Sequence, residues 1–158
     1  MATHRSVFCV FADDIRQEIG NKMTLVGVYQ GGMNVSGVPP QALSKLGISI
    51  FVQCPHELPF SKMAMDLVMG DEVLQHVEPS LAPDQLEAIS KPTHPESTGI
   101  GLNVVIVLQP FVVSRDGILR VKVKLDEEEM VSNGLFIKFV ERSESVAAAS
   151  PETALSTT

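Results

Sequence analysis

Residues 7–29 decide the fold of this chain and read V-F-C-V-F-A-D-D-I-R-Q-E-I-G-N-K-M-T-L-V-G-V-Y. The first five positions are all apolar, with β-branched and aromatic side chains, which predicts a strand covered on both faces. The charged segment D-D-I-R-Q-E then brings the chain to the surface, and Gly20-Asn21 suits the positive φ angles of a tight turn. Residues 22–29 give a second strand, so the stretch predicts two antiparallel strands joined by a charged connection.

An alternation of apolar and polar residues marks further strands along the chain. It is clearest in residues 46–54, which predict a core strand with one buried face. The apolar members of that strand are Leu46, Ile48, Ile50, Val52 and Cys54, and they alternate with Gly47, Ser49, Phe51 and Gln53. Other predicted strands are 33–35, the hairpin 63–69 and 72–77, the long strand 99–113 bent near Pro110, 118–125 and 135–139.

The segment 79–97 carries four of the prolines among polar residues and predicts a long connection. Inside it, Pro83 suits the first position of a helix, and Leu86 and Ile89 share one face. We therefore expect at most one short helix, near residues 83–90. Residues 142–158 are rich in Ala, Ser and Thr, which predicts a flexible tail after a single domain of residues 1–141.

Eight or nine short strands with turns between them favour an all-β fold, an antiparallel β-sandwich. An immunoglobulin-like Greek key is the preferred arrangement. A C2-like or jelly-roll sandwich stays open as the alternative, because strand count and alternation do not specify strand order.

Composition narrows the classes of partner and compartment. The 158 residues form an acidic chain with a net charge of −7, which disfavours nucleic acid and anionic membranes. The uncharged, mainly apolar run of residues 99–114 is shorter than the roughly 20 apolar residues of a membrane helix. The N-terminus lacks an apolar signal core, so we expect a cytoplasmic or virion-associated protein that is not secreted by a signal peptide. Cys9 and Cys54 are expected to be buried thiols and not a disulfide.

No pattern in the sequence predicts catalysis, a bound cofactor or a structural metal. Neither a G-x-S-x-G turn nor a G-K-[ST] phosphate loop occurs, and the four histidines are scattered without metal-ligand spacing. The protein is therefore expected not to be an enzyme. Carboxylates cluster at residues 13–18, 71–72 and 126–129, and loops of this kind could converge on Ca²⁺. Solvated acidic loops are the preferred interpretation.

The charged segment of residues 13–18 is the one candidate site. Asp13 and Asp14 could cap a turn while Arg16 pairs with one of them or with Glu18. That arrangement predicts a structural joint between the first two strands. An interaction motif made by Asp13, Asp14, Arg16 and Glu18 stays open beside it.

Residues 11–29 resemble the opening of a family of small uncharacterised proteins from bacteria and their phages. The shared pattern is D-D-I-R-x-E followed by G-x-K-x-[ST]-L-x-G-V-Y, and a D-G-x-L-R-V-x-V hairpin at residues 116–123 is similar to a later part of that family. The resemblance implies a small sandwich and a phage or prophage source, and it implies no activity.

These observations favour a non-enzymatic sandwich that acts through protein contacts or self-association, such as a phage or prophage structural or accessory component. Two alternatives remain at this point. One is a C2-like module that binds through calcium in acidic loops, and the other is a small phage-encoded regulator of a host protein.

Overall fold

A computed structural model describes residues 4–92 and 94–141 of the chain. The described residues share one hydrophobic core. The predicted flexible tail, residues 142–158, lies outside the described residues, so both the tail and the domain limit at residue 141 stay predictions.

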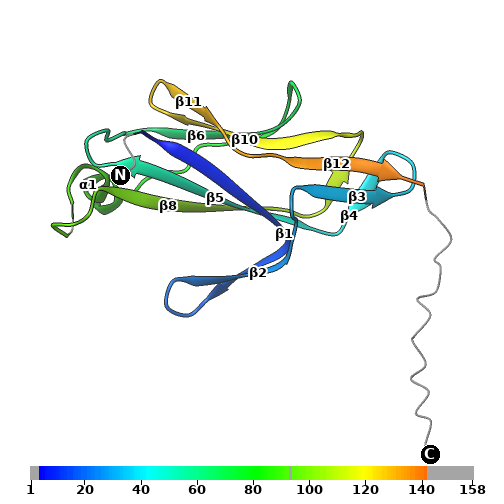
Figure 1. Cartoon of the computed structure of the whole chain (residues 1–158), viewed down its shortest axis with the longest axis horizontal. Helices are drawn as coiled ribbons and strands as arrows, with labels where there is room; N and C mark the ends of the chain where they lie inside the picture. The colour runs from blue at the N-terminus through cyan, green and yellow to red at the C-terminus, as the bar shows by residue number, and fades with distance from the viewer. Residues whose placement is uncertain (1–3, 93, 142–158) are drawn as a thin grey trace, which may run out of the picture.

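Strands account for most of the described chain, and one helix interrupts them (Figure 1). In chain order the elements are β1 (Ser6–Glu18), β2 (Lys22–Val28), β3 (Gly32–Ser36), β4 (Gln41–Leu43), β5 (Leu46–Pro55), β6 (Met63–Met69), β7 (Glu72–Val77), α1 (Pro83–Ser90), β8 (Gly99–Leu108), β9 (Phe111–Val113), β10 (Gly117–Leu125), β11 (Glu128–Val131) and β12 (Leu135–Val140).

Two sheets form the layers of a sandwich. Sheet A has the order β2-β1-β5-β8, and sheet B has the order β3-β12-β10-β6-β7 with β11 against β10. Figure 1 shows β1, β5 and β8 in one layer and β6, β10 and β12 in the other. β4 and β9 make a small third sheet. The prediction of an all-β sandwich with one short helix is confirmed, while the immunoglobulin-like strand order stays a prediction.

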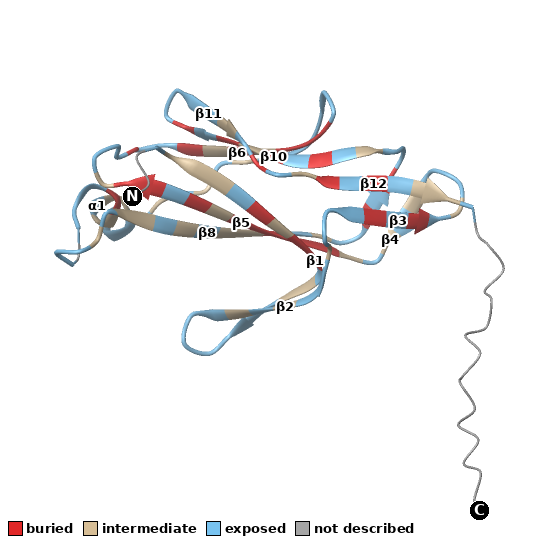
Figure 2. Cartoon of the chain, viewed as in Figure 1, coloured by how far each residue is buried: buried red, intermediate tan, exposed pale blue. Residues whose placement is uncertain are grey.

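The core lies between the two layers and follows the period of two (Figure 2). On β5 the five predicted apolar residues are all buried, and on β10 every second residue is buried while Arg120 and Lys124 are exposed. The buried members of β10 are Leu119, Val121, Val123 and Leu125. Cys9 and Cys54 are buried free thiols, as predicted.

The helix α1 begins and ends where its sequence signals place it. Pro83 occupies the first turn, the Gln85 side chain accepts a hydrogen bond from the Ala82 N–H (2.9 Å), and Ile89 is fully buried in the core. Proline lacks the N–H that a first turn cannot use, so it favours a helix start there. The prediction for residues 83–90 is confirmed.

The charged segment of residues 13–18 lies at the surface, as predicted, but it is a strand, so the prediction of a connection is wrong. β1 continues through Glu18, and the turn falls at Gly20 (φ 80°) and Asn21 (φ 57°). The reason is that this half of β1 pairs with β2 in a hairpin that leaves the sandwich body in Figure 1, so polar side chains on both of its faces can meet solvent. We call residues 13–18 together with β2 the arm.

Two further details differ from the sequence prediction. β3 and β12 are parallel, unlike every other pair in the described residues, because alternation along a strand does not specify the direction of its neighbour. The predicted bent strand 99–113 is two strands, β8 paired with β5 and β9 paired with β4. Pro110 separates them, since it offers no N–H to a ladder.

β11 and β12 lie along the same side of β10 and are separated by a bulge. Val131 pairs with Lys122 and Leu135 pairs with Leu119, so four steps on one strand match three on the other. A bulge of this kind re-aims a side chain. Here Asn133 points across to sheet A, where its amide bonds both the N–H (2.8 Å) and the C=O (2.9 Å) of Cys9.

Candidate interaction surface

The outer face of sheet A, on the side away from the core, is uncharged where β1, β5 and β8 lie side by side. Strand alternation and register place its members on three neighbouring strands. They are Ser6, Phe8, Val10 and Ala12 of β1, Gly47, Ser49, Phe51 and Gln53 of β5, and Gly101, Asn103, Val105 and Val107 of β8. None of these described residues carries a charge, although the chain has 12 Lys and Arg and 19 Asp and Glu.

Two phenylalanines form the apolar centre of this face. Phe8 lies directly opposite Phe51 on the neighbouring strand, and 55% of Phe8 is exposed. With Val10 they line a shallow hollow of about 440 Å³, bordered by the polar side chains of Ser6 and Gln53. Exposed aromatic side chains with a polar rim are typical of protein contact sites.

The prediction that residues 7–11 are covered on both faces is wrong. Cys9 and Phe11 are buried in the core, whereas Phe8 faces outward with nothing packed over it among the described residues. Sequence alone could not separate the two arrangements, because a fully apolar run fits either a doubly covered strand or a strand with an apolar outer face. The alternation in residues 46–54 did place Phe51 on the outer face.

The arm runs back over the outer face at the end away from Phe8. The Ile15 side chain lies against Gly47, where a Cβ would be 2.6 Å from it, and Ser49 Oγ lies 3.7 Å from Met23 Sδ. Ser49 is fully buried and also accepts a hydrogen bond from Asn103 Nδ2 (2.8 Å). Farther along, a hollow of about 680 Å³ separates the arm from β8.

Asp13 is held at the base of the arm. Its Oδ1 accepts a hydrogen bond from the Tyr29 hydroxyl (2.5 Å), and its carboxylate lies over Gly27, whose φ is +65°. Burial, together with the bond to Asp13 and its charge, raises the pKa of Tyr29 to about 12. The phenol therefore stays a hydrogen-bond donor at neutral pH.

The other three predicted site residues point elsewhere. Asp14 accepts a hydrogen bond from Lys45 and another from Arg16 Nε (3.0 Å), and these two bonds lower the pKa of its carboxyl. Glu18, near the tip, accepts a hydrogen bond from Thr24 Oγ1 (3.0 Å). Asp14 and Arg16 thus pair with each other, whereas Asp13 and Glu18 contact other residues, so the four do not meet in one site. The interaction role predicted for them stays a prediction.

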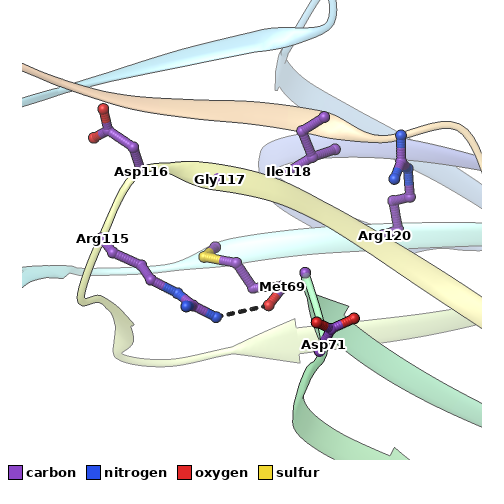
Figure 3. Close-up of a pocket in the computed structure, with 8 residues that line it drawn as sticks. Met69, Asp71, Arg115, Asp116, Gly117, Ile118 and Arg120 are labelled. Atoms are coloured by element: carbon purple, nitrogen blue, oxygen red, sulfur yellow. Dashed lines mark hydrogen bonds between the residues drawn. The ribbon is translucent and has the colours of Figure 1, made fainter.

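The outer face of sheet B is charged and contrasts with that of sheet A. Strand alternation places on it the charged or titratable residues Asp66, His76, Arg120, Lys122, Lys124, Glu129 and Lys138, together with the exposed apolar residues Ile118, Val131 and Phe136. A hollow of about 360 Å³ lies near the turns that join its strands, shown in Figure 3. Arg115 there donates to the Met69 carbonyl (2.9 Å) and pairs with Glu72 (3.2 Å), and Asp116 accepts from the Phe139 N–H (2.8 Å). These charged side chains therefore stabilise the turns between the strands.

The histidines and thiols also have structural surroundings. His56 lies between the Ile89 carbonyl (3.2 Å) and Ser97 Oγ (2.9 Å), so it ties the long connection to β5. Burial raises the pKa of the Cys9 thiol to about 11 and that of Cys54 above its usual value, which keeps both protonated. Among residues 4–92 and 94–141, no three His, Cys, Asp or Glu side chains gather so as to hold a metal ion.

Comparison with known proteins identifies no relative. No family model matches the chain, and neither the curated proteins nor the solved structures contain a match. Within the described residues, no helix is both long and apolar enough to cross a membrane.

Proposed function

We propose that this protein is a non-enzymatic binding module that contacts another protein chain through the outer face of sheet A. The observation that carries the proposal is the Phe8–Phe51 pair, which lies open on a face without charges in a chain of net charge −7. Such a chain stays soluble through its charge, so an uncharged apolar face costs solubility unless a partner covers it.

The immunoglobulin-like arrangement belongs to the same proposal. β1, β5 and β8 follow the order of strands A, B and E, and β12, β10, β6 and β7 follow the order of strands G, F, C and C′. The strand order supports this arrangement over a jelly roll. Sandwiches of this type commonly serve as contact modules in larger assemblies.

The resemblance of residues 11–29 to proteins of bacteria and phages supports a phage or prophage component as the setting. A regulator that blocks a host protein would use the same surface, and the neighbouring genes separate the two: virion genes favour a particle component, and early genes favour a regulator. No observation among the described residues favours the calcium-dependent module, since the acidic residues of the arm already bond to groups of their own chain.

Phe8→Glu tests the proposed contact. The matched control is Phe136→Glu, because Phe136 is similarly exposed (49%, against 55% for Phe8) on the charged outer face of sheet B. We expect both variants to keep the wild-type circular dichroism and melting temperature within a few degrees, since both side chains point to solvent. Sedimentation compares the self-association of the purified wild type and variants. The same proteins are also immobilised as baits for host proteins, and the binding of each captured protein is then measured again with both partners purified. Only Phe8→Glu should lose the contact, and equal behaviour of the two variants would overturn the proposal.

A further inference from the structure

Among the strands of the described residues, β8 is the last of sheet A and has a neighbouring strand on one side only. It pairs with β5, and the ladder continues past the strand through the hydrogen bond from the His56 N–H to the Thr98 carbonyl (3.2 Å). Bonding residues alternate in an antiparallel pair, so the even-numbered residues of β8 bond to β5. The N–H and C=O groups of Gly101, Asn103 and Val105 therefore point to the open side.

The core-facing side chains of β8 also lack full cover. Ile100, Leu102 and Val104 pack against the core but are only half-buried. A further strand beside β8 would cover these side chains and bond the outward backbone groups at the same time. The two observations, one on the backbone and one on the side chains, point to the same kind of ligand, an extended chain.

β8 lacks the charge and the proline that often protect a sheet edge from another strand, although Gln85 of α1 lines the same hollow as residues 101–105 of β8. Its ten residues, G-I-G-L-N-V-V-I-V-L, contain neither charge nor proline. The other edge strands of the two large sheets, β2, β3, β7 and β11, have seven, five, six and four residues. β2 begins at Lys22, and β7 carries Glu72 and His76. Short length and charge are two of the devices by which edges avoid pairing.

We propose that β8 pairs antiparallel with β8 of a second copy of this chain, so that two copies of sheet A become one continuous sheet. This inference goes beyond the proposed function, because it uses the edge of sheet A and not its outer face. A second copy fits because a net charge of −7 makes charged surfaces of two copies repel, whereas uncharged β8 strands meet without like-charge repulsion. With a twofold axis at Asn103, Gly101 of each copy lies opposite Val105 of the other. The outward N–H and C=O groups then face each other in register.

A pair of proline variants tests the pairing at matched positions. Val105 points its N–H to the open side of β8. Val26 does the same on β2, since the Tyr29 N–H bonds the Phe11 carbonyl (2.9 Å) and places the even-numbered residues of β2 outward. A proline at either position removes an outward N–H donor and keeps the hydrogen bonds to the inner neighbouring strand.

A single strand pair buries less than roughly 1,200 Å², so the dimer should be weak. Its dissociation is therefore measured by sedimentation at protein concentrations from roughly 1 μM to 1 mM. We expect at least a tenfold weaker dimer for Val105→Pro and no change for Val26→Pro.

Single cysteines provide a second measurement that does not depend on a tolerated proline. Gly101→Cys, Asn103→Cys, Val105→Cys and Val107→Cys are oxidised in turn, with Gln75→Cys on β7 as the control and the buried Cys9 and Cys54 unchanged. Facing residues of an antiparallel pair have Cα atoms about 5.5 Å apart, which suits a disulfide. The yield of disulfide-linked dimer should be highest for the cysteine on the twofold axis and lower for cysteines on either side of it.

The outcomes separate this inference from the proposed function. A wild-type chain that stays monomeric throughout, or a dimer unaffected by Val105→Pro with no disulfide at the four positions, overturns the pairing of β8. An association that survives Val105→Pro but is lost in Phe8→Glu also overturns it and leaves the proposed function standing. Association lost in Val105→Pro and kept in Phe8→Glu supports the pairing and removes the role given to the Phe8–Phe51 pair.

Discussion

The two sides of sheet A differ in whether their outward backbone N–H and C=O groups are bonded within the chain. Along β1, where β2 no longer reaches, the N–H and C=O of Cys9 are both bonded by the Asn133 amide from sheet B. Farther along, β2 itself covers β1. Along β8 no strand of the described chain takes that place. The edge along β1 is thus closed at Cys9 within the chain, and the difference teaches that an open edge at β8 is not an unavoidable result of this architecture.

The largest expected effect comes from opening the closed edge. Asn133→Ala removes the acceptor for the Cys9 N–H and the donor to its C=O, and each unsatisfied backbone group costs about 1–3 kcal/mol. We expect the free energy of unfolding, measured by urea denaturation, to fall by about 2–4 kcal/mol. Asn133→Asp keeps the acceptor only and should lie between the two. Equal stability of all three chains would show that this edge is closed by other contacts.

A smaller effect is expected from a pair of glycines on the two edges. Gly27 on β2 has a φ of +65°, and a Cβ there would overlap the Asp13 carboxylate. Gly101 on β8 has no atom within 4 Å of the place of a Cβ. Gly27→Ala should therefore lower the unfolding free energy by about 1–3 kcal/mol. Gly101→Ala should leave it unchanged or raise it by up to about 1 kcal/mol. Thermal melts of the two variants beside wild type give the comparison, and a Gly27→Ala melt that matches wild type would contradict the geometry of the arm.

How far the sequence predicted this contrast depends on the range of the interactions. Alternation in residues 46–54 predicted the buried face of β5, and Pro83 with its neighbours predicted α1, because both signals are local. The role of Asn133 was not predicted, since it depends on a bulge that aims one side chain at a strand more than a hundred residues earlier in the chain. The exposure of Phe8 was missed for a similar reason. Whether an apolar residue is covered depends on which elements reach it, and no local pattern encodes that.

Hydrogen exchange of single amides measures the two edges directly, without destabilising the chain. The Cys9 amide bonds Asn133, so it should exchange slowly at every protein concentration. The outward amides of Gly101, Asn103 and Val105 should exchange fast in dilute solution and slow down as the concentration rises and copies pair. The even-numbered amides of β8, bonded to β5, should stay slow throughout. Outward amides that are already protected in dilute solution would show that the edge is covered within one chain.

The smallest expected effect concerns β7, one edge strand of sheet B, which carries titratable side chains. His76 Nδ1 lies 2.5 Å from Asp66 and Nε2 lies 3.1 Å from Glu78, and these two carboxylates raise the pKa of the imidazole above its ordinary value of 6.5. Because the folded-state pKa is the higher one, protonated His76 stabilises the fold fully below the unfolded-state pKa. That contribution disappears as the pH rises through the folded-state pKa.

His76→Gln should therefore be slightly less stable than wild type in mildly acidic buffer and equal to it in alkaline buffer, measured by paired melts across the pH range. The difference should be small, because the ring is exposed and water screens both ion pairs. An NMR titration of His76 locates the pH at which the difference vanishes. If the variant were instead less stable in alkaline buffer, neutral His76 would be the stabilising form. In that case the charge that distinguishes the β7 edge from the uncharged β8 edge would come from carboxylates alone.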